Sequence, residues 1–207
     1  MTTIAADLFY LPNLEFFAAI WAADEVAFFP NDTYERKSFF NRSQILLSNK
    51  VETLSVPIVG RRPRIPQRDI RIDYGQKWHS KHLKSIQSAY GKAPFFEYFF
   101  PEFEAVFMRK TDFLWELSLE LVTLCLRLLQ QPVKMSICEN QMDQQFDKDI
   151  RGQIKPSEHF SGRNYYQAHA YTQLFGLDFE PNLSIIDLLF CEGPMAKNIL
   201  QESLKKH

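Results

Sequence analysis

The segment from Trp78 to Pro101, WHSKHLKSIQSAYGKAPFFEYFFP, places two histidines and several lysines beside an unusually aromatic stretch. Spacings of three and four predict one face of a helix that ends near Gly91 and Pro94. That face carries Trp78, His82, Ser85, Ile86, Ala89 and Tyr90. His82 could transfer a proton or bind an anion at a pocket. It could equally be a packed histidine bonded to a backbone carbonyl, and both interpretations remain open.

Composition limits the class of protein. With 207 residues, 45% of them hydrophobic and 14% aromatic, the chain is long enough for one well-buried core, so we expect a single domain over 1–207. A net charge of -1 with both signs interspersed argues against nucleic-acid binding. Cys125, Cys138 and Cys191 show no metal-ligand spacing and no disulfide framework. The sequence therefore predicts no metal site, and no pattern identifies a cofactor or an oligomeric state.

The beginning of the sequence, MTTIAADLFYLPNLEFF, has no basic start and carries Asp7 within its apolar stretch. This pattern is not that of a secretory signal. No apolar run approaches the roughly 18 residues that cross a bilayer. We therefore expect a cytoplasmic protein without membrane insertion.

The pattern of the first third of the chain predicts both parallel and antiparallel strands. Thr3–Tyr10, interrupted by Asp7, and Val26–Phe29 are expected strands joined by a helix over Asn13–Ala23. Ser43–Leu47 and Glu52–Val59 are expected to form a hairpin around the turn Ser48-Asn49-Lys50. Antiparallel pairing should therefore follow a parallel pair.

Helices dominate the rest. Apolar periodicity predicts a core helix over Asp112–Leu129, with Asp112 as its cap and Leu121 buried. The other expected elements are a helix over Pro101–Met108 after a short aromatic link, a strand over Val133–Cys138, and closing helices over Leu183–Phe190 and Pro194–Leu204. Together the elements predict an α/β fold, with α+β as the alternative: a mixed sheet flanked by helices, with a helical C-terminal part.

Two segments lack apolar periodicity. The first, Gly60–Arg71, contains five arginines, Arg61, Arg62, Arg64, Arg68 and Arg71, and is either a phosphate-gripping loop or a solvated basic loop. The second, Glu139–Asn164, is polar throughout and is expected to be a flexible loop or a lid over the site.

Three stretches together carry a resemblance to a known family. They are Asn41-Arg42, the Trp78–Pro101 segment with Lys84, and Asn182-Leu-Ser-Ile-Ile-Asp187. On these residues the chain resembles the WbqC-like family, bacterial proteins often associated with genes for cell-surface polysaccharides. Tyr10, Tyr34, Lys37 and Gln167 also fit the family outline. One departure is that Asp7-Leu8 occupy the positions at which relatives have Gln-Pro.

The resemblance implies a role in bacterial surface-polysaccharide (O-antigen type) biosynthesis. The implied reaction is acyl or aminoacyl transfer to a nucleotide-linked amino sugar, or another modification of it. The alternative is a non-catalytic protein that binds a nucleotide sugar or a related small anionic ligand. Catalysis is expected at His82, and substrate binding at Asp7, Tyr10, Tyr34, Lys37, Asn41, Arg42, Lys84, Gln167 and Asp187.

The most specific prediction is that residues far apart in the sequence line one pocket. Asn41 and Arg42 should converge with His82 on one pocket, where donors would hold an anion and the histidine would act as base. A catalytic site also requires that Asp7 share that pocket, because a titratable group must reach the bound ligand.

Overall fold

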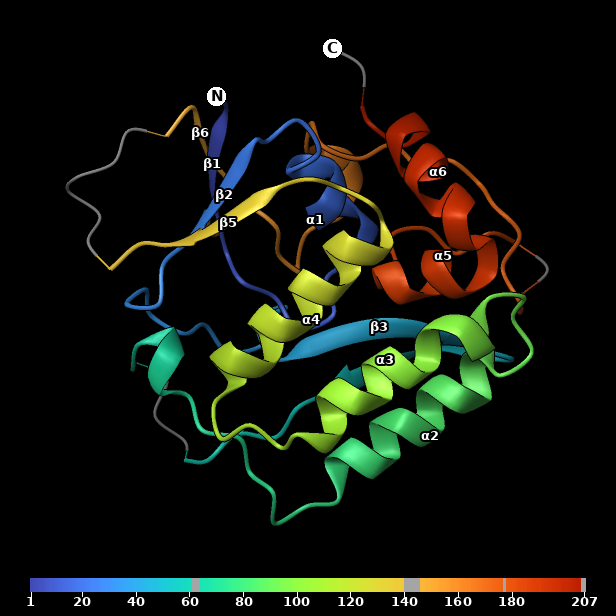
Figure 1. Cartoon of the computed structure of the whole chain (residues 1–207), viewed down its shortest axis with the longest axis horizontal. Helices are drawn as coiled ribbons and strands as arrows, with labels where there is room; N and C mark the ends of the chain where they lie inside the picture. Colours follow the sequence, from blue (N-terminus) through green and yellow to red (C-terminus); the bar gives the residue numbers. More distant parts are fainter. Residues whose placement is uncertain (61–63, 140–145, 177, 206–207) are drawn as a thin grey trace.

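The computed structural model describes residues 1–60, 64–139, 146–176 and 178–205. Four short parallel strands form one sheet in the order β5-β2-β1-β6 (Figure 1). These strands are β1 (Thr3–Ala6), β2 (Glu25–Phe28), β5 (Lys134–Ile137) and β6 (Lys148–Asp149). The predicted α/β class is confirmed, because parallel strands, an antiparallel pair and a helical C-terminal part are all present.

The strand–helix–strand unit at the start of the chain is confirmed, with a shorter helix than predicted. Helix α1 (Leu14–Ala19) begins after Asn13, whose side-chain oxygen accepts a hydrogen bond of 3.1 Å from the Phe16 amide. Strand β1 ends at Ala6, so Asp7 follows the strand instead of interrupting it. This difference places Asp7 at the carboxyl end of the parallel sheet.

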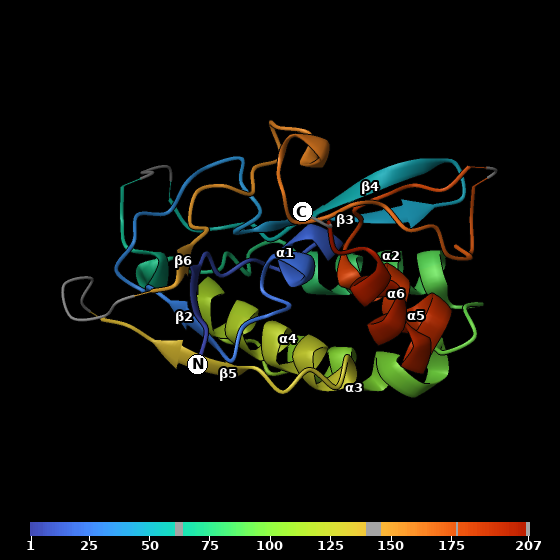
Figure 2. The same cartoon turned by 90° about the horizontal axis from the view of Figure 1, so that it is seen from above.

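The predicted hairpin consists of β3 (Arg42–Leu47) and β4 (Lys50–Ser55), paired antiparallel in a sheet of their own. Strand β3 packs against helix α2 (Trp78–Tyr90), as Figure 2 shows. The Tyr90 hydroxyl accepts a 3.3 Å hydrogen bond from the Leu46 amide. Parallel and antiparallel pairing therefore occur in two separate sheets. The prediction that α2 stops at Gly91 is confirmed.

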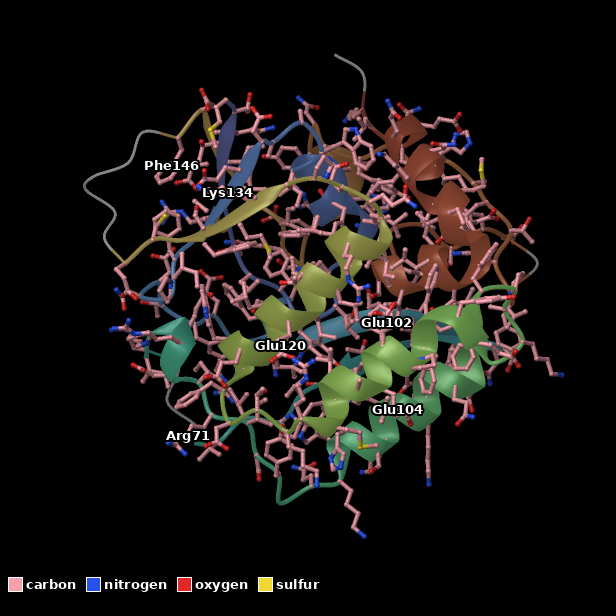
Figure 3. All side chains as sticks on the ribbon, in the orientation of Figure 1. Arg71, Glu102, Glu104, Glu120, Lys134 and Phe146 are labelled. Carbon is pink, nitrogen blue, oxygen red and sulfur yellow. The ribbon has the colours of Figure 1, made fainter. Side chains whose placement is uncertain are left out.

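Helices α3 (Phe96–Met108) and α4 (Leu114–Leu128) pack side by side. The prediction that α3 starts at Pro101 is wrong, because the aromatic residues before the proline form its first turns and bury Phe96. Asp112 does not cap α4, whose N-cap is Phe113. Ion pairs join the two helices: Arg127 with Glu102, and Arg109 with Glu120 at 2.9 Å. Figure 3 labels the two glutamates, Glu102 on α3 and Glu120 on α4.

The C-terminal helices are α5 (Ile185–Glu192) and α6 (Ala196–Glu202), separated by the short turn η4 (Gly193–Met195), which confirms the predicted break. One hydrophobic core receives side chains from all six α-helices. Leu121 is fully buried in it, as the periodicity of α4 predicted. No helix within the described ranges is long and apolar enough to cross a membrane.

The polar stretch Glu139–Asn164 contains more structure than its composition predicted. Residues 140–145 lie outside the described residues, but β6 and the turn η3 (Phe160–Gly162) follow them. Ile150 and Ile154 are only 2% and 3% exposed, so this stretch does have apolar anchors in the core. Two isoleucines were too few to register as a periodic pattern.

The structure describes part of the arginine-rich loop Gly60–Arg71. Arg61 and Arg62 lie outside the described residues. The 3-10 turn η1 (Gln67–Asp69) carries Arg68, which pairs with Glu139 at 2.7 Å. Arg71 lies 5.0 Å from the centre of the Phe113 ring and pairs with Asp112 at 4.0 Å. These two arginines are therefore bound to the protein surface.

Candidate functional site at the carboxyl edge of the parallel sheet

Charged residues that follow three of the parallel strands lie at the same edge of the sheet. Asp7 follows β1, Asp32 lies shortly after β2, and Arg151 follows β6. They line a cavity of about 290 Å³, together with Phe9, Thr33, Glu35, Ser38, Phe40, Gln67, Gly152, Ile154 and Lys155. Open α/β sheets commonly bind ligands at this edge, outside the carboxyl ends of the strands. We call this space the Asp7 cavity.

Asp7 is the titratable group of most interest in the cavity. Its carboxylate accepts a 2.6 Å hydrogen bond from the Gly152 amide. Burial raises its pKa from the ordinary 3.8 to about 6, against the lowering effect of that hydrogen bond. The neighbouring charges of Asp32 and Glu35 raise the pKa further, and Arg151 lowers it. Asp7 is thus a carboxylate poised near neutral pH, where a proton acceptor works best.

Arg151 shapes the cavity without offering a free cation. Its guanidinium bonds both oxygens of Asp149 and donates a 3.0 Å hydrogen bond to Asp32. It also lies 4.1 Å from the centre of the Phe29 ring. Arg151 therefore holds Asp32 in place. The other charged side chains of the cavity are Asp7, Glu35 and Lys155.

A second cavity, of about 270 Å³, adjoins the first, and Lys155 lines both. We call it the Phe39 cavity. Its lining also includes Phe39, Gln44, Pro156, Ser157, Glu158, His159, Phe160, Arg163, Glu180, Pro181 and Asn182. Figure 2 shows the orange turn η3, which carries Phe160, on the same side of the molecule as the hairpin β3–β4. Residues distant in sequence thus meet at this surface.

The structure places His82 away from both cavities, in the core. It is 6% exposed, and its Nδ1 atom forms a 2.8 Å hydrogen bond with the Tyr10 hydroxyl. The ring also donates to the Ser55 carbonyl, and burial lowers its pKa from 6.5 to about 4. These contacts match the packed-histidine interpretation, in which the buried ring is neutral at pH 7.

Asn41 and Arg42 form a neighbouring structural group. The Asn41 side chain accepts a 2.9 Å hydrogen bond from the Tyr34 hydroxyl and donates a 2.8 Å hydrogen bond to the Val56 carbonyl. Arg42 pairs in register with Ser55, the residue whose carbonyl accepts from His82. None of Asn41, Arg42 and His82 lines the Asp7 cavity or the Phe39 cavity, so the expected pocket shared with Asp7 is not found there.

The remaining predicted residues are dispersed. Asp187 is fully buried, and burial raises its pKa. Its carboxylate accepts a 2.5 Å hydrogen bond from the Tyr171 hydroxyl and a 3.0 Å hydrogen bond from the Gln173 side-chain amide. Lys37 is exposed on a loop, and Lys84 is exposed on α2. Gln167 is exposed beside the C-terminal end of α6. Of the ten predicted residues, Asp7 alone belongs to the cavity lining given above.

Sequence reasoning missed Asp32, Glu35, Arg151 and Lys155. A signal for Asp32 was available, since it follows the second parallel strand as Asp7 follows the first. Arg151 and Lys155 could not be placed without β6, whose two residues Lys148 and Asp149 give no apolar pattern. Among the described residues, no group of three or more histidine, cysteine or acidic side chains is arranged to hold a metal ion.

Comparison with known proteins identifies the family. The model of the WbqC-like protein family matches residues 9–170 and 162–199. The chain therefore belongs to the WbqC-like protein family, as its motifs indicated. No curated protein and no solved structure shows a significant match.

Proposed function

We propose that this protein is an enzyme of bacterial surface-polysaccharide biosynthesis that transfers an acyl or aminoacyl group to the amine of a nucleotide-linked amino sugar. The observation that carries the proposal is Asp7, a carboxylate with a pKa of about 6 in a cavity at the carboxyl edge of the sheet. Family membership supports the polysaccharide context.

The cavity suits a protonated amine. Asp7, Asp32 and Glu35 bring three carboxylates to a lining with two cations, Lys155 and the Arg151 guanidinium, which is paired with Asp32 and Asp149. An ammonium group would be attracted by the carboxylates. A neighbouring carboxylate takes its proton, the nitrogen attacks the acyl carbon, and the thioester or ester bond of the donor breaks, so that the donor leaves as a thiol or an alcohol. With a pKa of about 6, Asp7 is largely ionised at pH 7 and able to accept that proton.

In this proposal Asp7 takes the role of base that the sequence suggested for His82. The imidazole of His82 is buried, its Nδ1 atom is hydrogen-bonded to the Tyr10 hydroxyl, and the ring does not line the Asp7 cavity. Its contacts instead connect Tyr10 with α2 and with the end of β4. We therefore propose that His82 and Asn41 position the elements around the site without touching substrate.

A transfer assay tests the proposal. The protein would be incubated with nucleotide-linked amino sugars and with thioester or aminoacyl donors, and the new amide detected by mass spectrometry. Asp7→Asn should lower kcat by about 10²- to 10⁴-fold, the usual contribution of a general base. The control is Asp112→Asn, whose side chain is 70% exposed on the surface. Sugar binding without any product would favour the non-catalytic alternative, and full activity of Asp7→Asn would refute the role of Asp7.

A further inference from the structure

Lys155 lies where the two cavities meet. It is half-buried and lines both the Asp7 cavity and the Phe39 cavity. Over the described ranges of the chain, its ammonium group has neither an ion-pair partner nor a side-chain hydrogen bond. The ammonium group is therefore available to an anionic ligand that enters either cavity.

The guanidinium groups that line these cavities are in a different state. Arg151 is held by Asp149 and Asp32. Arg163 bonds both oxygens of the fully buried Glu15, at 2.5 and 2.8 Å, and also contacts Glu158 at 3.3 Å. Both arginines are therefore structural, whereas Lys155 is a basic side chain placed to bind an anionic group.

The Phe39 cavity has the groups that a nucleoside requires. The rings of Phe39 and Phe160 offer apolar surface for a base, and the exposed amide of Gln44 can donate and accept hydrogen bonds. The Glu180 carboxylate can accept hydrogen bonds from ribose hydroxyls. The two cavities together have the capacity of a small-molecule site, about 300–1,000 Å³.

We propose that Lys155 binds the diphosphate of a nucleotide sugar that spans both cavities, with the nucleoside in the Phe39 cavity and the sugar toward Asp7. The sugar's position rests on the proposed function, whereas the nucleoside diphosphate site does not. The order of groups in the ligand matches the order along the surface: the amine near the carboxylates, the phosphates at the lysine, and the base at the aromatic rings.

Calorimetric titration tests this arrangement. The probes are uridine, guanosine and thymidine diphosphates, together with inorganic pyrophosphate. We expect at least one nucleoside diphosphate to bind, and Lys155→Met to weaken it about 10- to 100-fold, the loss expected for a charge-assisted hydrogen bond. Lys81→Met, at an exposed lysine on α2, is the matched control and should leave affinity unchanged. Gln44→Ala should weaken the nucleoside diphosphate but not pyrophosphate.

The inference is overturned if no nucleoside diphosphate binds the wild-type protein, or if Lys155→Met binds within threefold of it. An equal loss in Lys81→Met would also overturn it, because the effect would then be one of general charge. Its failure is distinguishable from failure of the proposed function. Asp7→Asn should keep its affinity for the nucleoside diphosphate, which lacks the amine, so a Lys155-dependent site without transfer activity would refute only the proposed reaction.

Discussion

Replacing Asp7 with asparagine should stabilise the folded protein at neutral pH. The ionised carboxylate is held in a partly buried position beside Asp32 and Glu35, where its charge is disfavoured. Asparagine keeps a carbonyl oxygen that can accept the 2.6 Å hydrogen bond from Gly152 and carries no charge. The variant therefore resembles the protonated form of the site.

The magnitude follows from the pKa. Asp7 titrates at about 6 in the folded protein, against an ordinary value of 3.8. A difference of one in pKa corresponds to about 1.4 kcal/mol, so ionisation lowers the free energy of unfolding by at most about 3 kcal/mol. Solvent reaches part of the side chain and screens part of this effect, so we expect Asp7→Asn to gain about 1–3 kcal/mol at pH 7. At this chain length each kcal/mol raises Tm by about 2–4 °C.

The sign of the pH dependence gives a stricter test. Because the folded pKa is raised, the wild type loses stability as pH rises from about 4 to about 6, and Asp7→Asn does not. Urea unfolding of both proteins from pH 4 to 8 should give equal stabilities at the acid end and a constant difference above pH 7. Asp112→Asn should show little difference from wild type at any pH. A variant that is less stable at pH 7, or a gain that does not change with pH, would refute the argument for a raised pKa.

Three further perturbations test the packing described above. Leu121→Ala should cost about 2–5 kcal/mol in urea unfolding, because it leaves a cavity beneath a fully buried side chain; a loss below about 1 kcal/mol would contradict its place in the core. Arg163→Met should cost about 3–5 kcal/mol by leaving Glu15 buried and unpaired, whereas Arg109→Met, which breaks an exposed pair, should cost less than about 1 kcal/mol; equal losses would contradict the distinction. The lowered pKa of His82 predicts that the contribution of the neutral ring to stability is lost as pH falls from about 6.5 to about 4. His82→Gln should reduce this loss of stability at acid pH. A ¹⁵N NMR spectrum that shows a charged His82 ring at pH 6 would refute the lowered pKa.

The sequence predicted those parts of the fold that depend on local pattern. The periodicity of α2 and α4 and the hairpin turn are each encoded within a few residues, so they could be recognised without the tertiary structure. The start of α3 could not. Pro101 indicated a first turn, but burial of Phe96 and its stacking on Phe100, with ring centres 4.5 Å apart, extends the helix through the proline.

The candidate site was harder to predict because its residues come from loops that follow strands. The resemblance drew attention to His82, Asn41 and Asp187, which the structure shows in buried hydrogen-bonded groups. Such residues can recur throughout a family because they hold the scaffold, and their polar atoms then suggest chemistry that burial prevents. Lys155 offered no signal of its own, since its importance depends on which neighbouring arginines are already paired.

Asp7 stands where the resemblance places glutamine, and the physical difference between these side chains bears on the proposed reaction. A glutamine amide carries no charge to desolvate and cannot take up a proton near neutral pH. The aspartate makes the folded state less stable whenever it is ionised, and such a cost is typical of positions that serve function. A bound ammonium group would offset the cost, because a nearby positive charge favours the ionised carboxylate and lowers its pKa. The repulsion among Asp7, Asp32 and Glu35 that destabilises the free protein would thus become an attraction for the amine of the substrate.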